Sequence, residues 1–328
     1  MRMVGLVLTI VLATFVSGLA AQTEPDVRPL GQARVVSGPV DCDGQRCVTV
    51  EVACPDVAEP DRALLKIGQA AGLPARGTIV FTTGGGGTGL WEAFGTEARR
   101  VIAELRRAGF RTVQIRWLRP WLAGAPGALE GVGRLACRPS TVARWVYDNL
   151  HGGAGAYCAT GNSGGAGQIS YMPAQYGLAA ILDAIVPTGG PPFGRVDLGC
   201  IRDDPTYRRL WYAPSGANTL DRSFGYPGDG TGPCATSDET FRPYFEETSL
   251  ALGNWQYVYP KTMVWFLFGE SDTTNAVAQG LTYHRRLLQA GSPLVRATQV
   301  PGTGHGVPAT AAGANAVRDI MLRECRVR

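Results

Sequence analysis

Histidine is scarce in this sequence, and the cysteines are not spaced like metal ligands. The 328 residues include three histidines, and no two of the eight cysteines form a C-x-x-C pair. Structural zinc sites use closely spaced cysteines and histidines. We therefore expect no metal site, and we expect no cofactor either.

The sequence also lacks a strong excess of one charge. It has 31 Lys and Arg against 27 Asp and Glu, a net charge of +4, and no block of basic residues. Such a balance gives no reason to expect nucleic acid or an anionic membrane as a partner. An apolar content of 45% with 18% charged residues excludes disorder, and the length suits one sizeable core with an inserted cap.

The sequence begins with an apolar run that is too short for a comfortable membrane span of about 20 residues. Arg2 precedes this uncharged run, Met3 to Val16, and small residues follow it up to Ala21. This arrangement is typical of a secretory signal peptide at residues 1–21. We predict an exported protein, secreted or periplasmic, with one domain over residues 22–328 and no integral membrane segment after removal of the signal.

All eight cysteines lie in the predicted exported part. An even number in an exported chain indicates disulfides, but eight cysteines allow 105 pairings. Two pairs are suggested by position. Cys42 and Cys47 would close a small loop, and Cys200 with Cys234 would staple a long insertion.

Strand-like and helix-like segments alternate along most of the chain. This order predicts an α/β fold with a mostly parallel sheet covered on both faces, whose function gathers at the carboxyl ends of the strands. Residues 22–76 are less informative and could add antiparallel edge strands. We expect strands at 47–53, 77–82, 112–115, from 156, at 180–186, 263–268 and 294–300, and helices at 94–105, from the N-cap Ser140 to 150, after 163, at 275–289 and 311–325.

Ser163 stands in the stretch Gly161-Asn162-Ser163-Gly164-Gly165, which matches G-x-S-x-G. A short apolar run precedes it, and residues at helical spacing follow it. Strand, glycine turn with a serine at its apex, and helix together make a nucleophile elbow. The glycines are needed because the strained turn leaves no room for side chains. The sequence therefore predicts Ser163 as a nucleophile.

A glycine run follows the strand that ends near Thr82. Backbone N–H groups in such a run approach a ligand oxygen closely, so Gly85 and Gly86, with Gly164, are candidate oxyanion-hole donors. The same run also fits the dinucleotide motif G-x-G-x-x-G through Gly84, Gly86 and Gly89. That alternative is weaker, because the next strand ends in Arg116-Trp-Leu-Arg119 rather than an acidic residue.

An acid and a histidine should follow the serine in the chain. Asp272 comes just after the strand 263–268, and His305 lies in a small-residue loop after the last strand. His151 precedes the serine strand at the wrong end of the sheet. His284 shares a helical stripe with Val277, Leu281 and Leu288, which favours a packed histidine. Glu270 and Asp197 remain alternative acids, and Asp183 fits a structural ion pair better.

The glycine run, the serine turn, Asp272 and His305 together resemble the secreted α/β-hydrolase esterases and lipases over roughly residues 75–325. The resemblance implies a Ser163–His305–Asp272 triad, an acyl-enzyme intermediate, and an ester substrate that is a small molecule, a lipid or a polymer. Thr83 replaces the histidine of the His-Gly-Gly-Gly form. A peptidase or acyltransferase of the same fold, or a non-catalytic binding protein, remains an alternative.

The insertion at about 190–260 is the expected cap, and it should set the substrate preference. We expect at least half of its aromatic residues to form the core of the cap and the others to line an acyl site. Trp117 and Trp121 are expected to contribute to the wall of that site. The aromatic residues are Phe193, Tyr207, Trp211, Tyr212, Phe224, Tyr226, Phe241, Tyr244, Phe245, Trp255, Tyr257 and Tyr259.

Overall fold

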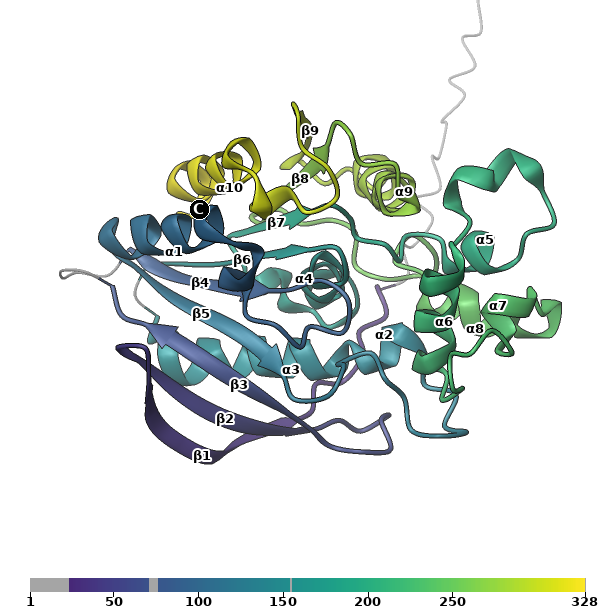
Figure 1. Cartoon of the computed structure of the whole chain (residues 1–328), viewed down its shortest axis with the longest axis horizontal. Helices are drawn as coiled ribbons and strands as arrows, with labels where there is room; N and C mark the ends of the chain where they lie inside the picture. Colours follow the sequence, from purple (N-terminus) through teal and green to yellow (C-terminus); the bar gives the residue numbers. More distant parts are fainter. Residues whose placement is uncertain (1–23, 71–75, 154, 328) are drawn as a thin grey trace, which may run out of the picture.

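One nine-stranded sheet organises the protein, in the order β1-β2-β3-β5-β4-β6-β7-β8-β9 (Figure 1). The computed structural model describes residues 24–70, 76–153 and 155–327, so the predicted signal peptide lies outside it. The strands from β5 to β9 are parallel, whereas β1, β2 and β3 add an antiparallel edge. The strands are β1 (Gln32–Cys42), β2 (Gln45–Ala53), β3 (Asp61–Gly68), β4 (Gly77–Thr82), β5 (Phe110–Trp117), β6 (Ala156–Asn162), β7 (Ala184–Thr188), β8 (Met263–Gly269) and β9 (Val295–Val300).

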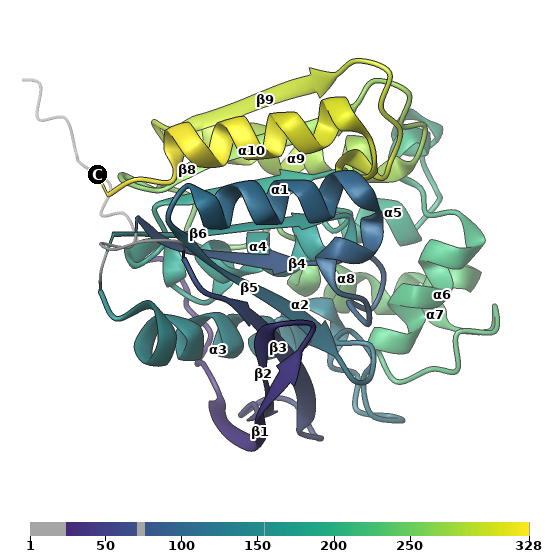
Figure 2. The ribbon, with the colours of Figure 1, turned by 60° about the vertical axis from the view of Figure 1, so that its left-hand side comes forward.

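Helices cover both faces of the sheet, because the central parallel strands β4, β6, β7 and β8 bury their side chains on both faces. In β4, Ile79 and Phe81 pack into one cluster, and Val80 packs into the other. The first cluster lies under helices α1 (Thr96–Arg107) and α10 (Ala311–Glu324), which run side by side in Figure 2. The second cluster lies under α3 (Cys137–Val146), α4 (Gly164–Gln175) and α9 (Asn275–Gln289).

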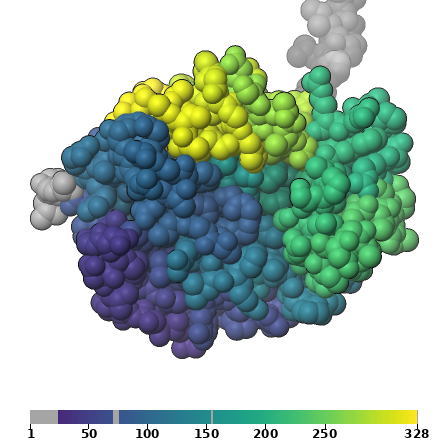
Figure 3. All heavy atoms as spheres, in the orientation of Figure 1, coloured from purple at the N-terminus to yellow at the C-terminus, as the bar shows by residue number. Residues whose placement is uncertain are grey.

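Residues 189–262, between β7 and β8, form a helical layer at the carboxyl ends of the parallel strands, and we call this segment the cap (Figures 1 and 3). The cap contains α5 (Val196–Cys200), a 3-10 helix (Pro205–Leu210), α6 (Pro214–Ser223), α7 (Pro233–Thr236) and α8 (Arg242–Thr248). Phe224, Phe241 and Phe245 form its own aromatic core with ring centroids 5.6 to 6.1 Å apart.

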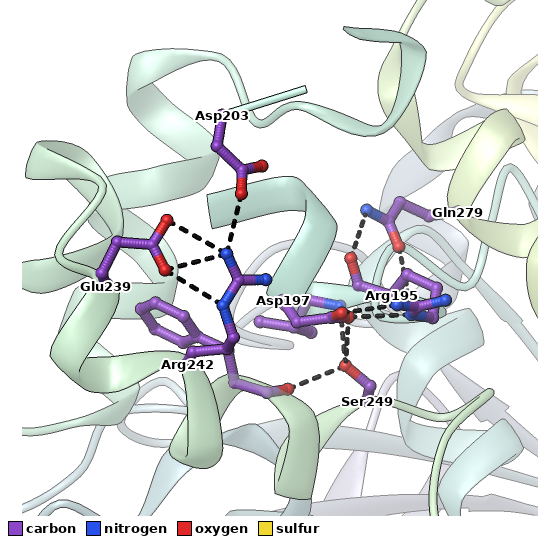
Figure 4. Close-up of polar contacts among 9 residues, drawn as sticks. Arg195, Asp197, Asp203, Glu239, Arg242, Ser249 and Gln279 are labelled. Carbon is purple, nitrogen blue, oxygen red and sulfur yellow. Dashed lines mark hydrogen bonds and ion pairs between the residues drawn. The ribbon is translucent and has the colours of Figure 1, made fainter. Parts of the chain in front are cut away.

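Polar contacts fix the cap internally and to the rest of the protein (Figure 4). The buried carboxylate of Asp197 accepts two hydrogen bonds from Arg195, at 2.9 and 2.6 Å. Gln279 of α9 accepts a hydrogen bond from the main-chain N–H of Arg195 at 2.6 Å and donates to its carbonyl at 3.0 Å. Because Gln279 is fully buried, these bonds are shielded from water and tie the start of the cap to α9.

All eight cysteines form disulfides. The structure contains both pairs suggested by position, Cys42–Cys47 and Cys200–Cys234. The other two, Cys54–Cys137 and Cys158–Cys325, join segments 83 and 167 residues apart. No helix in the described part of the chain is long and apolar enough to cross a membrane.

Two sequence-based expectations about the bounds of these elements are wrong in detail. Ser140 is not an N-cap but is fully buried inside α3, which starts at Cys137 after the short helix α2 (Gly131–Leu135). Pro139 fits the first turn of α3, where the missing N–H costs no hydrogen bond. The predicted strand 180–186 begins only at Ala184, because a 3-10 turn precedes it.

The buried face of α9 also differs from the predicted apolar stripe. Leu281 and Leu288 are exposed by 37% and 48%, whereas Gln279 and Tyr283 are fully buried. The helix packs against the sheet on one side and holds the cap on the other, so a polar side chain with cap partners occupies the buried face. Apolar spacing alone could not predict this, because it scores glutamine as a surface residue.

Candidate active site

Ser163 occupies a strained turn between β6 and α4. Its φ and ψ angles are 55° and −118°, a backbone conformation that side-chain-bearing residues rarely adopt. A Cβ at Gly161 would lie 2.1 Å from Thr82 Oγ1, and one at Gly165 would lie 2.7 Å from the carbonyl oxygen of Thr82. Both positions therefore require glycine, which explains the G-x-S-x-G spacing in physical terms.

The turn lets β4 approach the serine closely enough to bring its glycine loop alongside. A Cβ at Gly84 would lie 3.3 Å from Ser163 Cβ, and one at Gly164 would lie 2.4 Å from the carbonyl oxygen of Gly85. The hydroxyl of Thr83 donates to the carbonyl oxygen of Gly89 at 2.9 Å and so closes the loop. Thr83 thus stabilises the loop at the position where the His-Gly-Gly-Gly form of esterases and lipases has a histidine.

The two candidate donors in this loop differ in their surroundings. Gly85, with a φ of +57°, lines the same cavity as Ser163 and Gly164. A Cβ on Gly86 would instead lie 2.5 Å from Pro120. A short 3-10 helix (Trp91–Phe94) follows the loop and α1 begins only at Thr96, so no α-helix starts at these glycines as the dinucleotide motif requires.

Asp272 and His305 come together although 33 residues separate them. His305 Nδ1 lies 2.8 Å from Asp272 Oδ2. Asp272 Oδ1 accepts hydrogen bonds from the main-chain N–H of Thr274 at 2.9 Å and from its hydroxyl at 2.7 Å. Asp272 follows β8 and His305 follows β9, so neighbouring parallel strands deliver both residues to one edge of the sheet.

These hydrogen bonds keep the Asp272 carboxylate charged. Burial alone would raise the pKa of Asp272, but the hydrogen bonds from His305 and Thr274, together with the charge of His305 when protonated, lower the pKa below its ordinary value. A charged carboxylate at Nδ1 holds the imidazole proton on that nitrogen and leaves Nε2 as the basic atom. Thr274 was not identified from the sequence, although a threonine two residues after an aspartate is a common turn signal.

Asn162, the residue before the serine, links the turn to the His305 loop. Its buried Oδ1 accepts hydrogen bonds from Thr188 Oγ1 at 2.8 Å and from the main-chain N–H of Val307 at 3.3 Å. The main-chain N–H of Ser163 in turn donates to the carbonyl oxygen of Thr188 at 2.9 Å. The sequence reasoning missed this role, because no local pattern relates Asn162 to Val307.

Ser163, Gly85, Gly164 and His305 line one cavity of about 750 Å³ under the cap. Most of the lining is apolar, with two cationic side chains from the 3-10 helix of the cap. Trp117 and Trp121 do not line it, contrary to expectation, since both are fully buried under the glycine loop and Trp117 donates to Gln168 at 3.1 Å. The cap and its neighbours contribute Leu122, Pro192, Phe193, Trp211, Tyr212, Arg208 and Arg209 among others.

The remaining histidines and acids have other partners. His151 is buried, lies 3.2 Å from Thr78 Oγ1 and stacks on Tyr147. His284 contacts the ring of Phe266 edge-on at 5.4 Å. Glu270 accepts from the main-chain N–H of Gly302, Asp183 accepts from the main-chain N–H of Tyr157, and Asp197 holds Arg195.

The sheet order, the helices on both faces and the serine turn after β6 define an α/β-hydrolase fold. Solved esterase structures share it. The hyperthermophilic esterase from the archaeon Pyrobaculum calidifontis is similar with a TM-score of 0.53 and 19% identity over 85% of this chain and 83% of that one. A highly thermostable carboxyl esterase from Bacillus coagulans is similar with a TM-score of 0.52 and 14% identity over 84% of this chain and 96% of that one.

Est1E from Butyrivibrio proteoclasticus is similar as well, with a TM-score of 0.50 and 14% identity over 89% of this chain and 98% of that one. No protein-family model and no curated protein sequence matches the chain. At identities of 14 to 19% these likenesses define the fold alone. The chemistry must therefore be argued from the residues of the site.

Proposed function

We propose that this protein is a serine hydrolase that cleaves carboxylic esters through an acyl-enzyme intermediate. The observation that carries the proposal is the His305–Asp272 hydrogen bond of 2.8 Å at a cavity whose lining includes Ser163 on its strained turn. The nucleophile Ser163, the orienting acid Asp272 and the base His305 follow one another in the chain order of α/β-hydrolases. The esterase activity named for the similar structures agrees with this assignment.

In the first step, Ser163 Oγ attacks the acyl carbon of the ester while His305 Nε2 takes the hydroxyl proton. Asp272 stabilises the imidazolium that forms, because its carboxylate stays ionised. The main-chain N–H groups of Gly164 and Gly85 are proposed to hold the oxyanion, and Gly86 is the weaker candidate since it is not part of the cavity lining. The C–O bond then breaks, and the alcohol leaves with the proton from His305.

In the second step, His305 accepts a proton from water as the water oxygen attacks the acyl carbon. The bond to Ser163 Oγ breaks, His305 returns the proton to the serine, and the carboxylic acid leaves. The cap keeps most of the cavity wall apolar, which strengthens the electrostatic interactions inside the site.

Hydrolysis of a short-chain aryl ester by the purified mature protein tests the proposal, with Ser163→Ala beside it. We expect turnover that the variant loses by roughly a thousandfold or more. An aryl organophosphonate should label the wild type at Ser163 and leave the variant unlabelled. A folded wild type that neither turns over nor becomes labelled would contradict the serine mechanism.

We also infer that the protein is exported, with residues 1–21 as the cleaved signal peptide. Four disulfides within the described residues support an oxidising compartment. Expression of the full-length chain with N-terminal sequencing of the product tests this inference. A product that begins near Gln22 supports it, and a product that retains residues 1–21 contradicts it.

A further inference from the structure

Arg208 and Arg209 place two positive charges on the wall of the cavity that holds Ser163. Both side chains are exposed, and no Asp or Glu lines this cavity. Neither arginine takes part in an ion pair with any carboxylate of the described residues, whereas Arg195 and Arg242 of the same cap are each paired. Two adjacent cations without a counter-charge repel each other, and a bound anion would relieve that repulsion.

The arginines stand on a firmly held element. The carbonyl oxygen of Leu210, next to Arg209, accepts hydrogen bonds from Asn275 Nδ2 at 3.2 Å and from Gln279 Nε2 at 2.9 Å. Gln279 also holds both main-chain groups of Arg195, as Figure 4 shows. The backbone of the 3-10 helix Pro205–Leu210 is thus fixed to α9, and less ordering is needed when a ligand binds.

Positive charge continues beyond the catalytic cavity. Arg209 also lines a second cavity of about 680 Å³, together with Arg195, Arg285 and Arg286, and again no carboxylate is part of the wall. Asp197 balances Arg195, and Arg286 lies over the ring of Tyr257 at 4.4 Å with its Nε buried and unbonded. Arg209 therefore stands where two cavities meet, and an anionic group bound to it can face either one.

We propose that the site prefers esters that carry a carboxylate away from the scissile bond, and that Arg208 and Arg209 bind this carboxylate. The inference rests on the proposed function, because it assigns the substrate class of the same cavity. A guanidinium group matches a carboxylate with paired N–H donors, and such charge-assisted bonds are stronger than neutral ones. The apolar part of the substrate would lie against Phe193 and Trp211, which line the same cavity.

The test compares matched ester pairs that differ only in charge. The first pair is an aryl half-ester of adipic acid and its terminal carboxamide, and the second pair carries the carboxylate or carboxamide on the aryl leaving group. The full mature protein is assayed as wild type, Arg208→Gln, Arg209→Gln and Arg107→Gln. Arg107 ends α1, is exposed and lines neither cavity, so its substitution changes the net charge equally and serves as the control.

We expect the wild type to prefer the carboxylate member of at least one pair by about tenfold in kcat/KM. Each cavity arginine variant should lower that preference by about threefold to tenfold, and the control should leave it unchanged. The wild-type preference should also shrink as salt rises. The preference is the ratio of two kcat/KM values measured on the same protein sample. A partial loss of folded enzyme lowers both values equally and leaves this ratio unchanged.

Equal rates for the members of both pairs in the wild type would overturn the proposal while leaving the serine hydrolase intact. A preference that survives in both cavity variants would overturn the assignment to Arg208 and Arg209. If neither member of any pair is turned over, and the organophosphonate does not label Ser163, the proposed function itself fails and the substrate class fails with it.

Discussion

Asn162 Oδ1 accepts a hydrogen bond from the main-chain N–H of Val307 at 3.3 Å, although 145 residues separate the two. The same oxygen accepts from Thr188 Oγ1 at 2.8 Å. One buried amide thus joins the residue before Ser163, the end of β7 and the loop that carries His305. We interpret Asn162 as a positioning residue that fixes the distance between the proposed nucleophile and the proposed base.

Asn162→Ala should lower kcat for a short-chain aryl ester by about tenfold or more, with a smaller change in KM, because misplacement of the base affects the chemical step. Loss of the acceptor should also reduce the free energy of unfolding by about 1–3 kcal/mol. Thr188→Val is the matched variant, since it removes one donor and keeps the bond to Val307. It should reduce kcat less, and an equal loss in both variants would contradict the bridging role.

Gly161→Ala should destabilise the protein by about 2 kcal/mol or more, because its Cβ would lie 2.1 Å from Thr82 Oγ1 and 2.5 Å from the carbonyl oxygen of Gly165. Gly89→Ala is the control, since a Cβ there meets no atom within 4 Å. Urea unfolding of both variants measures the difference. Equal stabilities would show that the elbow relaxes more easily than its contacts indicate.

Asp272→Asn should reduce kcat for the aryl ester by roughly 10³- to 10⁴-fold, because an amide at this position no longer fixes the tautomer or stabilises the imidazolium. Glu270→Gln serves as a comparison, since Glu270 is exposed, faces Gly302 and keeps an acceptor oxygen when it becomes an amide. We expect Glu270→Gln to retain most of the activity. If Asp272→Asn retained activity and Glu270→Gln lost it, Glu270 rather than Asp272 would be the acid that orients His305.

The free energy of unfolding should decrease as the pH is lowered below 6.5. Burial and the charge of Arg111 lower the pKa of His151 from its ordinary value of 6.5, and burial and Arg285 do the same for His284. In the window between 6.5 and each lowered pKa, the unfolded chain binds the proton that the folded chain does not, so the free energy of unfolding decreases as pH falls. Well above pH 6.5 both histidines are neutral in the folded and the unfolded chain, so they contribute no slope there.

His151→Gln tests this prediction by urea unfolding across the pH range. The side chain keeps polar groups for Thr78 and cannot titrate, so the slope below pH 6.5 should be shallower than in the wild type. His284→Gln should reduce the slope independently, because the two histidines pack against different strands. An unchanged slope in both variants would show that other groups control the acid sensitivity.

The elements and residues whose signals are local could be predicted from the amino-acid sequence. The alternation of strand-like and helix-like segments predicted the α/β class. The bounds of β4 and α9 were predicted correctly, because a glycine run follows β4 and the residues of α9 recur at helical spacing. The residues around Ser163 identify the turn, since only glycine fits at positions 161 and 165. Asp272 and His305 could be proposed because each directly follows a strand, and parallel strands end at a common edge.

The contacts between residues that are distant in the sequence could be seen only in the three-dimensional fold. The contact of Asn162 with Val307, the Cys54–Cys137 and Cys158–Cys325 pairs, and the burial of Trp117 and Trp121 depend on strand order, which the sequence does not record locally. The cap is the clearest case. Its sequence shows aromatic residues, but the anchoring of its 3-10 helix to α9 places Arg208 and Arg209 on the cavity wall, because a buried glutamine on α9 holds the carbonyl oxygen of Leu210.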